Sequence, residues 1–331
     1  MIGLDRTIRL PFTYYFMYKK VKYQRKFICS YLYWDLEKFK RENDHSLDEQ
    51  DFRKITHYYG LGVPAILGES FCILRESEMT LKERLASTYQ GAMTGLFDDF
   101  FDKKDISLGQ IIEILDNPYK HEGTTAIERL FLHYYRKALE NADSQNYVKK
   151  SLFDVYEAQV DSKKQTSPLL SNDEIHDITF RKGGLSLLFY RGSFSHSMDR
   201  RELKMLYLMG GMMQLGNDIF DVYKDSKTGI RTLVTNAKHI SHIRLLLKKC
   251  LKEWKILVDE LNYPEQNREA FKRFVTLGMS RCFVCLDQLE SLEIKTFGVF
   301  SPSIYSRDEL ICDMEKTGNI VKALMYYLTL L

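Results

Sequence analysis

The chain has 331 residues, of which 44% are hydrophobic and 13% aromatic, so it can bury a sizeable core. Its 48 basic and 45 acidic residues leave a formal net charge of +3, which excludes the strongly basic character of a typical nucleic acid-binding protein. Six prolines in the whole chain leave room for long helices. These features suit a single-domain helical bundle over residues 1–331, and the helices predicted below make the expected fold all-α.

The N-terminus, Met1 to Arg6, has no apolar segment of the signal-peptide type, and no run of about 18 apolar residues occurs in the chain. The six cysteines are scattered and flanked by apolar residues, which is typical of free thiols in a reducing compartment. These features predict a cytoplasmic protein with no stable membrane insertion and no nucleic acid partner. A homodimer stays open.

Residues 1–24 combine an aromatic cluster, Tyr14 to Tyr18, with lysines at positions 19, 20 and 22. We expect an N-terminal arm whose aromatic side chains pack on the domain while the lysines face water. A patch for a membrane surface is the alternative, because basic and aromatic residues interleave. Helices are predicted over residues 27–41 and 47–59, and Gly60 and Gly62 are expected to end the second.

A long helix is predicted from Thr80 to Asp105. Thr80 and Glu83 form a capping box, and apolar residues then recur at steps of three and four. The helix ends in the acidic sequence Asp98-Asp99-Phe-Phe-Asp102. Carboxylates near a helix C-terminus are disfavoured by the helix dipole, so local stability does not explain them.

Further helices are predicted over residues 124–141, 146–163 and 173–190. The third contains Gly183 and Gly184, and two glycines inside a helix indicate a kink or a close approach of the backbone. Another helix begins at the cap formed by Asp199 and Glu202 and continues to Asp225. Three more are expected over residues 239–260, 265–292 and 306–330.

The helix that ends at Asp225 carries Asn217, Asp221 and Asp225 at four-residue steps, with Lys224 beside them. Residues four apart share one side of a helix, as Asp98 and Asp102 also do. Buried carboxylates repel one another unless a cation neutralises them. Mg²⁺ binds through a few carboxylates, waters and substrate phosphates. The two acidic stretches therefore predict a cage for a metal-bound diphosphate.

The pair of motifs, DDxxD and then N-D-x-x-D-x-x-K-D, resembles the metal-binding pair of class I terpene synthases. The D-x-x-x-D of Asp221 and Asp225 resembles the second motif of squalene and phytoene synthases and their cyclising relatives. The resemblance implies a helical bundle of the isoprenoid synthase type with a central active-site cavity. It also implies a prenyl diphosphate substrate and a cluster of Mg²⁺ ions, three in that family, with Mn²⁺ as a substitute.

The resemblance also implies roles for individual residues. The implied metal ligands are Asp98, Asp99, Asp102, Asn217, Asp221 and Asp225, and the implied diphosphate-binding residues are Arg181, Lys182, Lys224 and Arg231. Asp98, Asp99 and Lys224 are also expected to act in catalysis, as are Gly183 and Gly184 if the helix breaks there and exposes a carbonyl. A plain helix crossing at the glycines is the alternative. The aromatic residues expected to line the cavity and stabilise a carbocation are Tyr89, Phe97, Phe180, Phe189 and Phe220.

The predicted reaction is the Mg²⁺-dependent ionisation and cyclisation of geranylgeranyl diphosphate, with farnesyl diphosphate as the second choice of substrate. One alternative is a prenyltransferase, either of the head-to-head or of the chain-elongating type. Elongating enzymes would have a second full DDxxD, and head-to-head enzymes a longer D-x-x-x-D in the first motif. A helical protein that binds isoprenyl diphosphate without catalysis is the remaining alternative.

Overall fold

The computed structural model describes the backbone of residues 2–102 and 108–330, and the side chains of these residues outside 2–9 and 98–108. All regular structure within these ranges is helical, which confirms the all-α prediction. Contacts between residues divide the chain into two compact units. Unit 1 comprises residues 1–9, 154–188 and 198–331, and unit 2 comprises residues 10–153 and 189–197. The predicted organisation as a single domain stays a prediction.

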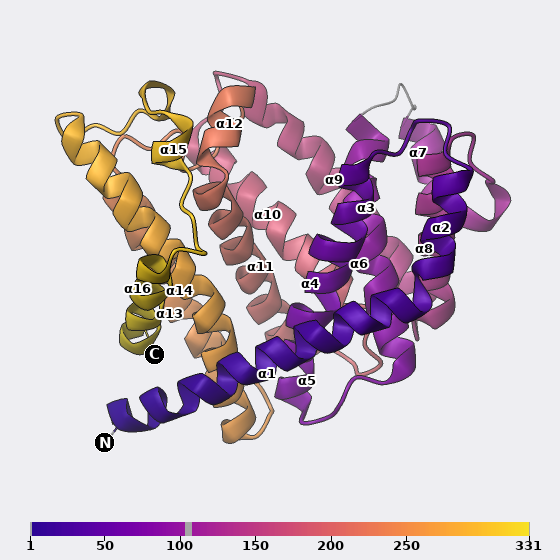
Figure 1. The fold of residues 1–331 in the computed structure, drawn as a ribbon, viewed down its shortest axis with the longest axis horizontal. Coiled ribbons are helices and arrows are strands. Elements are labelled where there is room, and N and C mark those ends of the chain that lie inside the picture. The colour runs from indigo at the N-terminus through magenta and orange to yellow at the C-terminus, as the bar shows by residue number, and fades with distance from the viewer. Residues whose placement is uncertain (1, 103–107, 331) are drawn as a thin grey trace. The chain divides into compact units, whose positions relative to one another are not determined.

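Unit 2 is built around the contact of α6 with α8, which lie side by side in Figure 1. Its core includes the fully buried rings of Phe71, Phe131, Tyr134 and Tyr135. The first residues of the long helix α1 belong to unit 1, and the rest of it belongs to unit 2. The helices of unit 2 are α1 (Ile2–Tyr31), α2 (Tyr33–Arg41), α3 (Glu49–Arg53), η1 (Lys54–Tyr58), α4 (Tyr59–Gly62), η2 (Val63–Gly68), α5 (Glu69–Arg75), α6 (Leu81–Asp102), α7 (Leu108–Asp116), η3 (Pro118–Lys120) and α8 (Ala126–Asn141).

Unit 1 is built on α14, which packs against α11, α13 and α16. Trp254, Phe271, Phe283 and Tyr327 are its largest fully buried rings. Its helices, including α9 and α10 whose ends extend into unit 2, are α9 (Gln145–Ser162), η4 (Lys163–Thr166), α10 (Asn172–Arg191), α11 (Arg200–Phe220), α12 (Val222–Thr228), α13 (Ile240–Asp259), α14 (Glu265–Lys295), η5 (Pro302–Ile304), α15 (Arg307–Leu310) and α16 (Thr317–Leu330).

Several predicted helix boundaries are wrong. The helix expected over residues 27–41 is divided between α1, which already begins at Ile2, and α2. The helix expected to stop at Gly60 continues through π-helical turns to Arg75. A Cβ on Gly91 of α6 would lie less than 3.0 Å from the Tyr59 carbonyl oxygen and 3.1 Å from the Gly60 Cα, so Gly91 and Gly60 allow the close packing of α4 on α6. The C-terminal helix expected over residues 306–330 is divided into α15 and α16, where Gln288 Nε2 donates to the carbonyl oxygens of Glu309 (2.6 Å) and Ile311 (3.1 Å).

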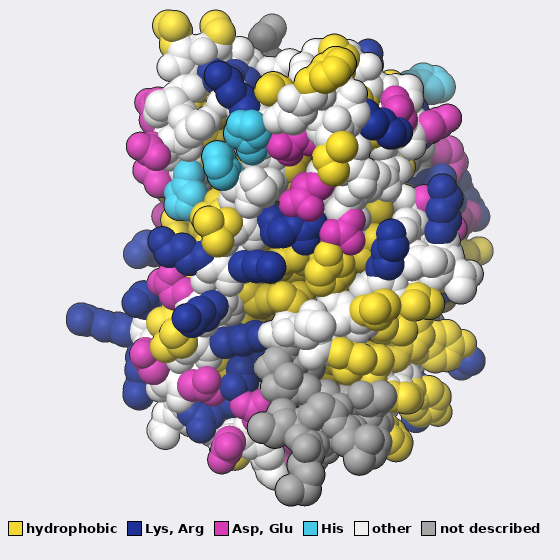
Figure 2. Space-filling model, turned by 90° about the vertical axis from the view of Figure 1, so that its left-hand side faces the viewer, with side chains coloured by type: hydrophobic (Ala, Val, Ile, Leu, Met, Phe, Trp, Pro, Cys, Tyr) yellow, Lys and Arg dark blue, Asp and Glu magenta, His cyan; other side chains and the backbone are white. Residues whose placement is uncertain are grey.

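The N-terminal aromatic residues do not pack as expected. Side chains of α1 from Phe12 to Tyr18 are exposed or half-buried, and those of Tyr14 and Tyr15 are exposed. Apolar side chains and lysine or arginine side chains also lie next to one another on the face of the molecule drawn in Figure 2. In the parts of the chain that the structure describes, no helix is long and apolar enough to span a membrane.

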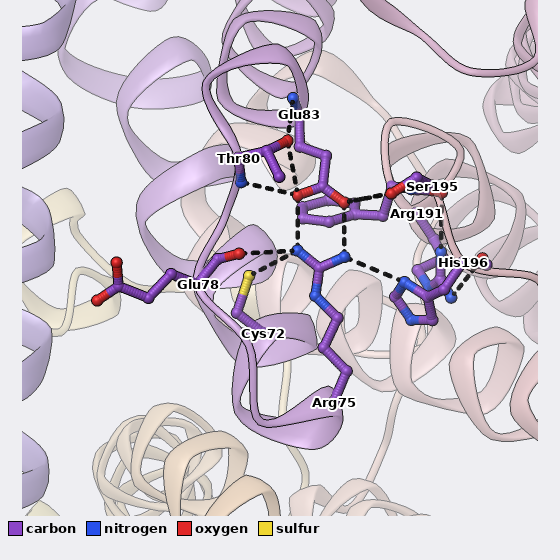
Figure 3. A network of polar contacts seen from close by, with 9 residues as sticks. Cys72, Arg75, Glu78, Thr80, Glu83, Arg191, Ser195 and His196 are labelled. Carbon is purple, nitrogen blue, oxygen red and sulfur yellow. Dashed lines mark hydrogen bonds and ion pairs between the residues drawn. The ribbon is translucent and has the colours of Figure 1, made fainter.

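The capping box predicted at Thr80 and Glu83 is present and is part of a larger network in unit 2 (Figure 3). The Glu83 carboxylate accepts two hydrogen bonds from Arg75, at 2.5 and 2.7 Å, and further bonds from Thr80 and Ser195. Burial alone would raise the pKa of Glu83, but these donors outweigh it and lower the pKa to about 2. The network holds the segment before α6 and residues 195–196 to the start of α6.

We expect the Arg75→Met variant to lose about 3 to 5 kcal/mol of unfolding free energy, because Glu83 is then buried without its cation. Lys82→Met, next to Glu83 at the start of α6, is the control, since Lys82 and Asp143 form an exposed pair at 3.6 Å that contributes at most about 1 kcal/mol. Because the pKa of Glu83 is lowered on folding, its contribution is present above its ordinary pKa and is lost as the pH falls toward 2. Equal losses in the two variants on urea denaturation would contradict this account.

Candidate functional site

The second acidic motif lies where α11 meets α12 in unit 1. Asp199 caps α11 by accepting the Glu202 N–H at 2.8 Å, as the sequence predicts. The helix does not continue unbroken to Asp225, because Asp221 leaves the helical region with φ −91° and ψ 9°. The backbone bonds from Asp221 to Asn217 (2.8 Å) and from Asp225 to Asp221 (2.9 Å) persist across this interruption. The motif residues therefore still follow one another along a helical path.

Among the predicted ligands whose side chains the structure describes, Asp225 has a carboxyl group with a strongly raised pKa. Burial raises its pKa first, and the neighbouring carboxylates of Asp218 and Asp221 raise it further, to about 7. The cations Lys224 and Lys182 act in the opposite direction. The site thus holds several carboxylates close enough to repel one another, beside two lysines.

Asp218 is a residue that the sequence interpretation did not assign to the site. It is buried between α11 and α10, where it accepts hydrogen bonds from Gln214 Nε2 (2.9 Å) and Thr179 Oγ1 (3.2 Å). Burial raises its pKa to about 6, against the effect of these bonds and of Lys182. A signal was available, because residues 214, 218, 221 and 225 follow steps of four, three and four, which place them on one side of a helix.

The other predicted ligands differ in burial. Asn217 and Asp221 are exposed, whereas Asp225 is buried. Among the residues whose side chains are described, no three His, Cys, Asp or Glu side chains are grouped so that they could hold a metal ion. The donor set nevertheless fits a hard divalent cation, because it consists of oxygen atoms only and its carboxylates repel one another without a cation.

The first acidic motif is described only in its backbone. Asp98, Asp99 and Asp102 occupy the last turns of α6, as predicted, and their side chains lie outside the described part of the structure. Their role as metal ligands therefore stays a prediction from the sequence.

The four predicted diphosphate-binding residues have different surroundings. The positive charge of Lys182 lowers the pKa values of Asp218 and Asp225. Lys224 is exposed and lies next to Asp225 in the sequence. Arg181 instead pairs with Asp161 and with Glu157 (3.4 Å). Of these two residues, Lys182 is therefore favoured over Arg181 as the basic residue that interacts with the second acidic motif.

The Arg231 side chain is hydrogen-bonded to the backbone of the loop that precedes α10. Its Nη1 donates to the carbonyl oxygens of Ser167 (3.2 Å), Pro168 (2.6 Å) and Leu170 (2.9 Å), and its Nη2 donates to Asn236 Oδ1 at 2.7 Å. These contacts give Arg231 a structural role, and its binding to a diphosphate stays a prediction.

The glycine pair of α10 lies at a helix crossing. The helix runs without a break from Asn172 to Arg191, so the break implied by the resemblance is wrong for this chain. A Cβ on Gly183 would lie less than 3.0 Å from the Gly210 carbonyl oxygen, and one on Gly184 would collide with the Tyr207 ring. The alternative of a glycine-mediated crossing is confirmed, while a part in catalysis for Gly183 and Gly184 stays a prediction.

The predicted cavity aromatics fall in both units. In unit 2, Tyr89 stacks on Tyr134 with ring centroids 5.7 Å apart, Phe97 packs on Phe131 and Phe189 packs on Tyr190. In unit 1, Phe180 stacks on His176 at 4.3 Å, and the Phe220 ring lies 5.8 Å from the Arg281 guanidinium. All of these rings except that of Phe220 are buried. Their contacts do not show that any of them lines a substrate cavity, so this role stays a prediction.

A surface pocket of about 380 Å³ lies within unit 1 between α10, α11 and α13. Its lining includes Phe180 and Arg181 from the predicted set, together with His176, Asp177, Lys204, Tyr207, Leu208, Glu253 and Leu257. The lining contains none of the acidic motif residues. This pocket is therefore separate from the carboxylates of α11 and α12.

No protein-family model matches the chain, and no curated protein matches it. Among solved structures, a dehydrosqualene synthase in complex with ligand is similar over 96% of this chain and 97% of that chain, at 13% sequence identity and a TM-score of 0.43. A similarity of this size carries no conclusion about family or activity.

Proposed function

We propose that this chain is a class I terpene synthase-like enzyme that ionises and cyclises a linear prenyl diphosphate, with geranylgeranyl diphosphate as the first choice of substrate and farnesyl diphosphate as the second. The observation that carries the proposal is the carboxylate cluster of α11 and α12, in which buried Asp225 has a raised pKa beside Asp218, Asp221 and two lysines. Such a cluster costs stability, so a charged ligand is the physical reason to keep it. We also propose that its helical bundle is of the isoprenoid synthase type.

Asn217, Asp221 and Asp225 are the residues of this unit that would hold Mg²⁺, and Asp98, Asp99 and Asp102 are the ligands predicted from the first motif. The bound ions would supply electrostatic stabilisation of the departing diphosphate. Lys182 and Lys224 would add fixed positive charge for the same group. Buried aromatic side chains would keep water from the carbocation and stabilise it through their ring faces.

The test is to incubate purified protein and Mg²⁺ with geranyl, farnesyl, geranylgeranyl and farnesylgeranyl diphosphates separately, followed by mass analysis of the organic extract. A cyclic terpene from one substrate alone is the expected result and identifies the chain length. Condensed or elongated chains, formed with or without isopentenyl diphosphate, would assign the protein to the prenyltransferases. Tight binding without any product would favour the non-catalytic alternative.

A further inference from the structure

The outer face of α1 carries an unusual number of exposed aromatic side chains. Five of them lie within the described part of this helix and are between 54% and 70% exposed: Phe12, Tyr14, Tyr15, Tyr18 and Tyr23. Trp34, at the start of α2, is 75% exposed and packs edge-on against Tyr33. Large rings at this exposure lose the stabilisation that burial gives, so a partner surface is the physical reason to place them there.

The same face is positively charged. Between Arg6 and Trp34 the sequence contains no Asp or Glu. Lys19, Lys22, Arg25 and Lys26 are exposed, and among the described residues no ion pair involves them. Residues 12, 15, 19, 22 and 26 follow steps of three and four, so aromatic and basic side chains form one stripe along the helix.

The inner side of α1 is fixed to unit 2. Gln24 is fully buried, and its Nε2 donates to Thr88 Oγ1 (2.9 Å) and to the Gly60 carbonyl oxygen (3.2 Å). Among the basic side chains of α1 that the structure describes, Lys20 turns inward and pairs with Glu69 at 2.8 Å. The aromatic and basic face is therefore presented outward by a helix that is held in place.

We propose that this outer face of α1, with Trp34, docks on the surface of an anionic lipid bilayer. Tyrosine and tryptophan rings favour the headgroup level of a membrane, where one part of the ring is in an apolar and the other in a wet environment. The lysines and the arginine attract anionic headgroups, so both kinds of side chain on the face find a partner in the same surface. A second copy of the chain would bring cations against cations, and a nucleic acid would neutralise the cations without burying the rings in an apolar layer.

The proposal concerns contact with the bilayer surface and does not depend on the enzymatic activity proposed for the chain. The full-length protein is tested by flotation with vesicles of phosphatidylcholine alone and with vesicles that contain about 30% phosphatidylserine. We expect binding to the anionic vesicles only, and at least about a tenfold weaker partition of the triple variant Lys19→Glu, Lys22→Glu, Lys26→Glu. A second variant, Phe12→Ser with Tyr15→Ser, keeps the charge and is expected to bind more weakly at every salt concentration.

The matched control is Lys248→Glu, Lys249→Glu, Lys252→Glu, which changes the net charge equally on the exposed side of α13. It is expected to keep most of the binding. Circular dichroism of each variant confirms that the helices are retained. Equal losses in the α1 and α13 variants would overturn the proposal, as would binding that ignores the lipid charge. Preferred binding to a single-stranded oligonucleotide, or dimerisation that the α1 variants abolish, would overturn it in favour of those partners.

Discussion

Replacing Asp225 by asparagine is expected to stabilise the metal-free protein while it lowers turnover of a prenyl diphosphate by at least about a hundredfold. The gain arises because burial and two neighbouring carboxylates raise the pKa of Asp225 to about 7. Removing one of these mutually repelling charges should contribute about 1 to 3 kcal/mol of unfolding free energy at pH 8. The loss arises because the same carboxylate is a predicted metal ligand.

The sign of the pH dependence follows from the raised pKa. The folded state keeps a proton on Asp225 that the unfolded chain releases near pH 4, so the wild type loses stability as the pH rises from about 4 to about 7. The difference between Asp225→Asn and the wild type should therefore grow over this range in thermal unfolding experiments. Asp177→Asn is the control, because Asp177 is an exposed aspartate of α10 outside the cluster and its replacement should change stability by at most about 0.5 kcal/mol. No stability gain in Asp225→Asn would contradict the account of the cluster, and unchanged turnover would contradict the ligand assignment.

The Gly210→Ala variant is expected to lose at least about 2 kcal/mol of unfolding free energy. Its added methyl group would lie less than 3.0 Å from the Gly183 carbonyl oxygen, so α10 and α11 would have to separate. Gly278→Ala is the matched control, since nothing lies within 4 Å of a Cβ at that exposed position of α14. The control should gain up to about 1 kcal/mol from the better helix propensity of alanine.

The two glycines can also be tested together. Because Gly183 and Gly210 contact each other, the losses of Gly183→Ala and Gly210→Ala should not add in the double variant. Fully additive losses, or a Gly210→Ala variant as stable as Gly278→Ala, would show that the helices do not cross at this point. Denaturant unfolding of the four variants provides the measurement.

Much of the helical framework follows from the sequence. Steps of three and four between apolar residues predict α6, and the capping pairs Thr80 with Glu83 and Asp199 with Glu202 predict where α6 and α11 begin. These signals are local, because each cap is closed by groups within one turn of the helix. The sequence therefore predicts them without knowledge of the tertiary structure.

The predictions from the sequence are wrong where tertiary contacts determine where a helix ends or whether a side chain is buried. Gly60 and Gly62 look like a helix end, but the helical path continues through both, and Gly60 lies at the close packing of α4 on α6. Gln288 reaches from α14 to satisfy carbonyl oxygens at the end of α15, and nothing local predicts that contact. The tyrosines of α1 were expected to be covered because large rings are usually buried, and their exposure cannot be inferred from periodicity.

In the candidate site too, some features follow from local sequence spacing and others depend on tertiary packing. The spacing of Asn217, Asp221 and Asp225 is visible in the sequence, whereas the inward turn of Asp218 toward Thr179 depends on the packing of α10 on α11. The choice between Arg181 and Lys182 also depends on neighbours, because adjacent helix positions point about 100° apart. Arg181 forms an ion pair with Asp161, whereas the charge of Lys182 lowers the pKa values of Asp218 and Asp225.

The most direct test of the central claim is the release of inorganic diphosphate when the purified protein is mixed with geranylgeranyl or farnesyl diphosphate and Mg²⁺. The account predicts release over many turnovers with one of these substrates alone, and its loss in Asp225→Asn although that variant is folded and more stable without metal. No release by the folded wild type from either substrate, with or without isopentenyl diphosphate, would contradict the claim that this chain ionises prenyl diphosphates.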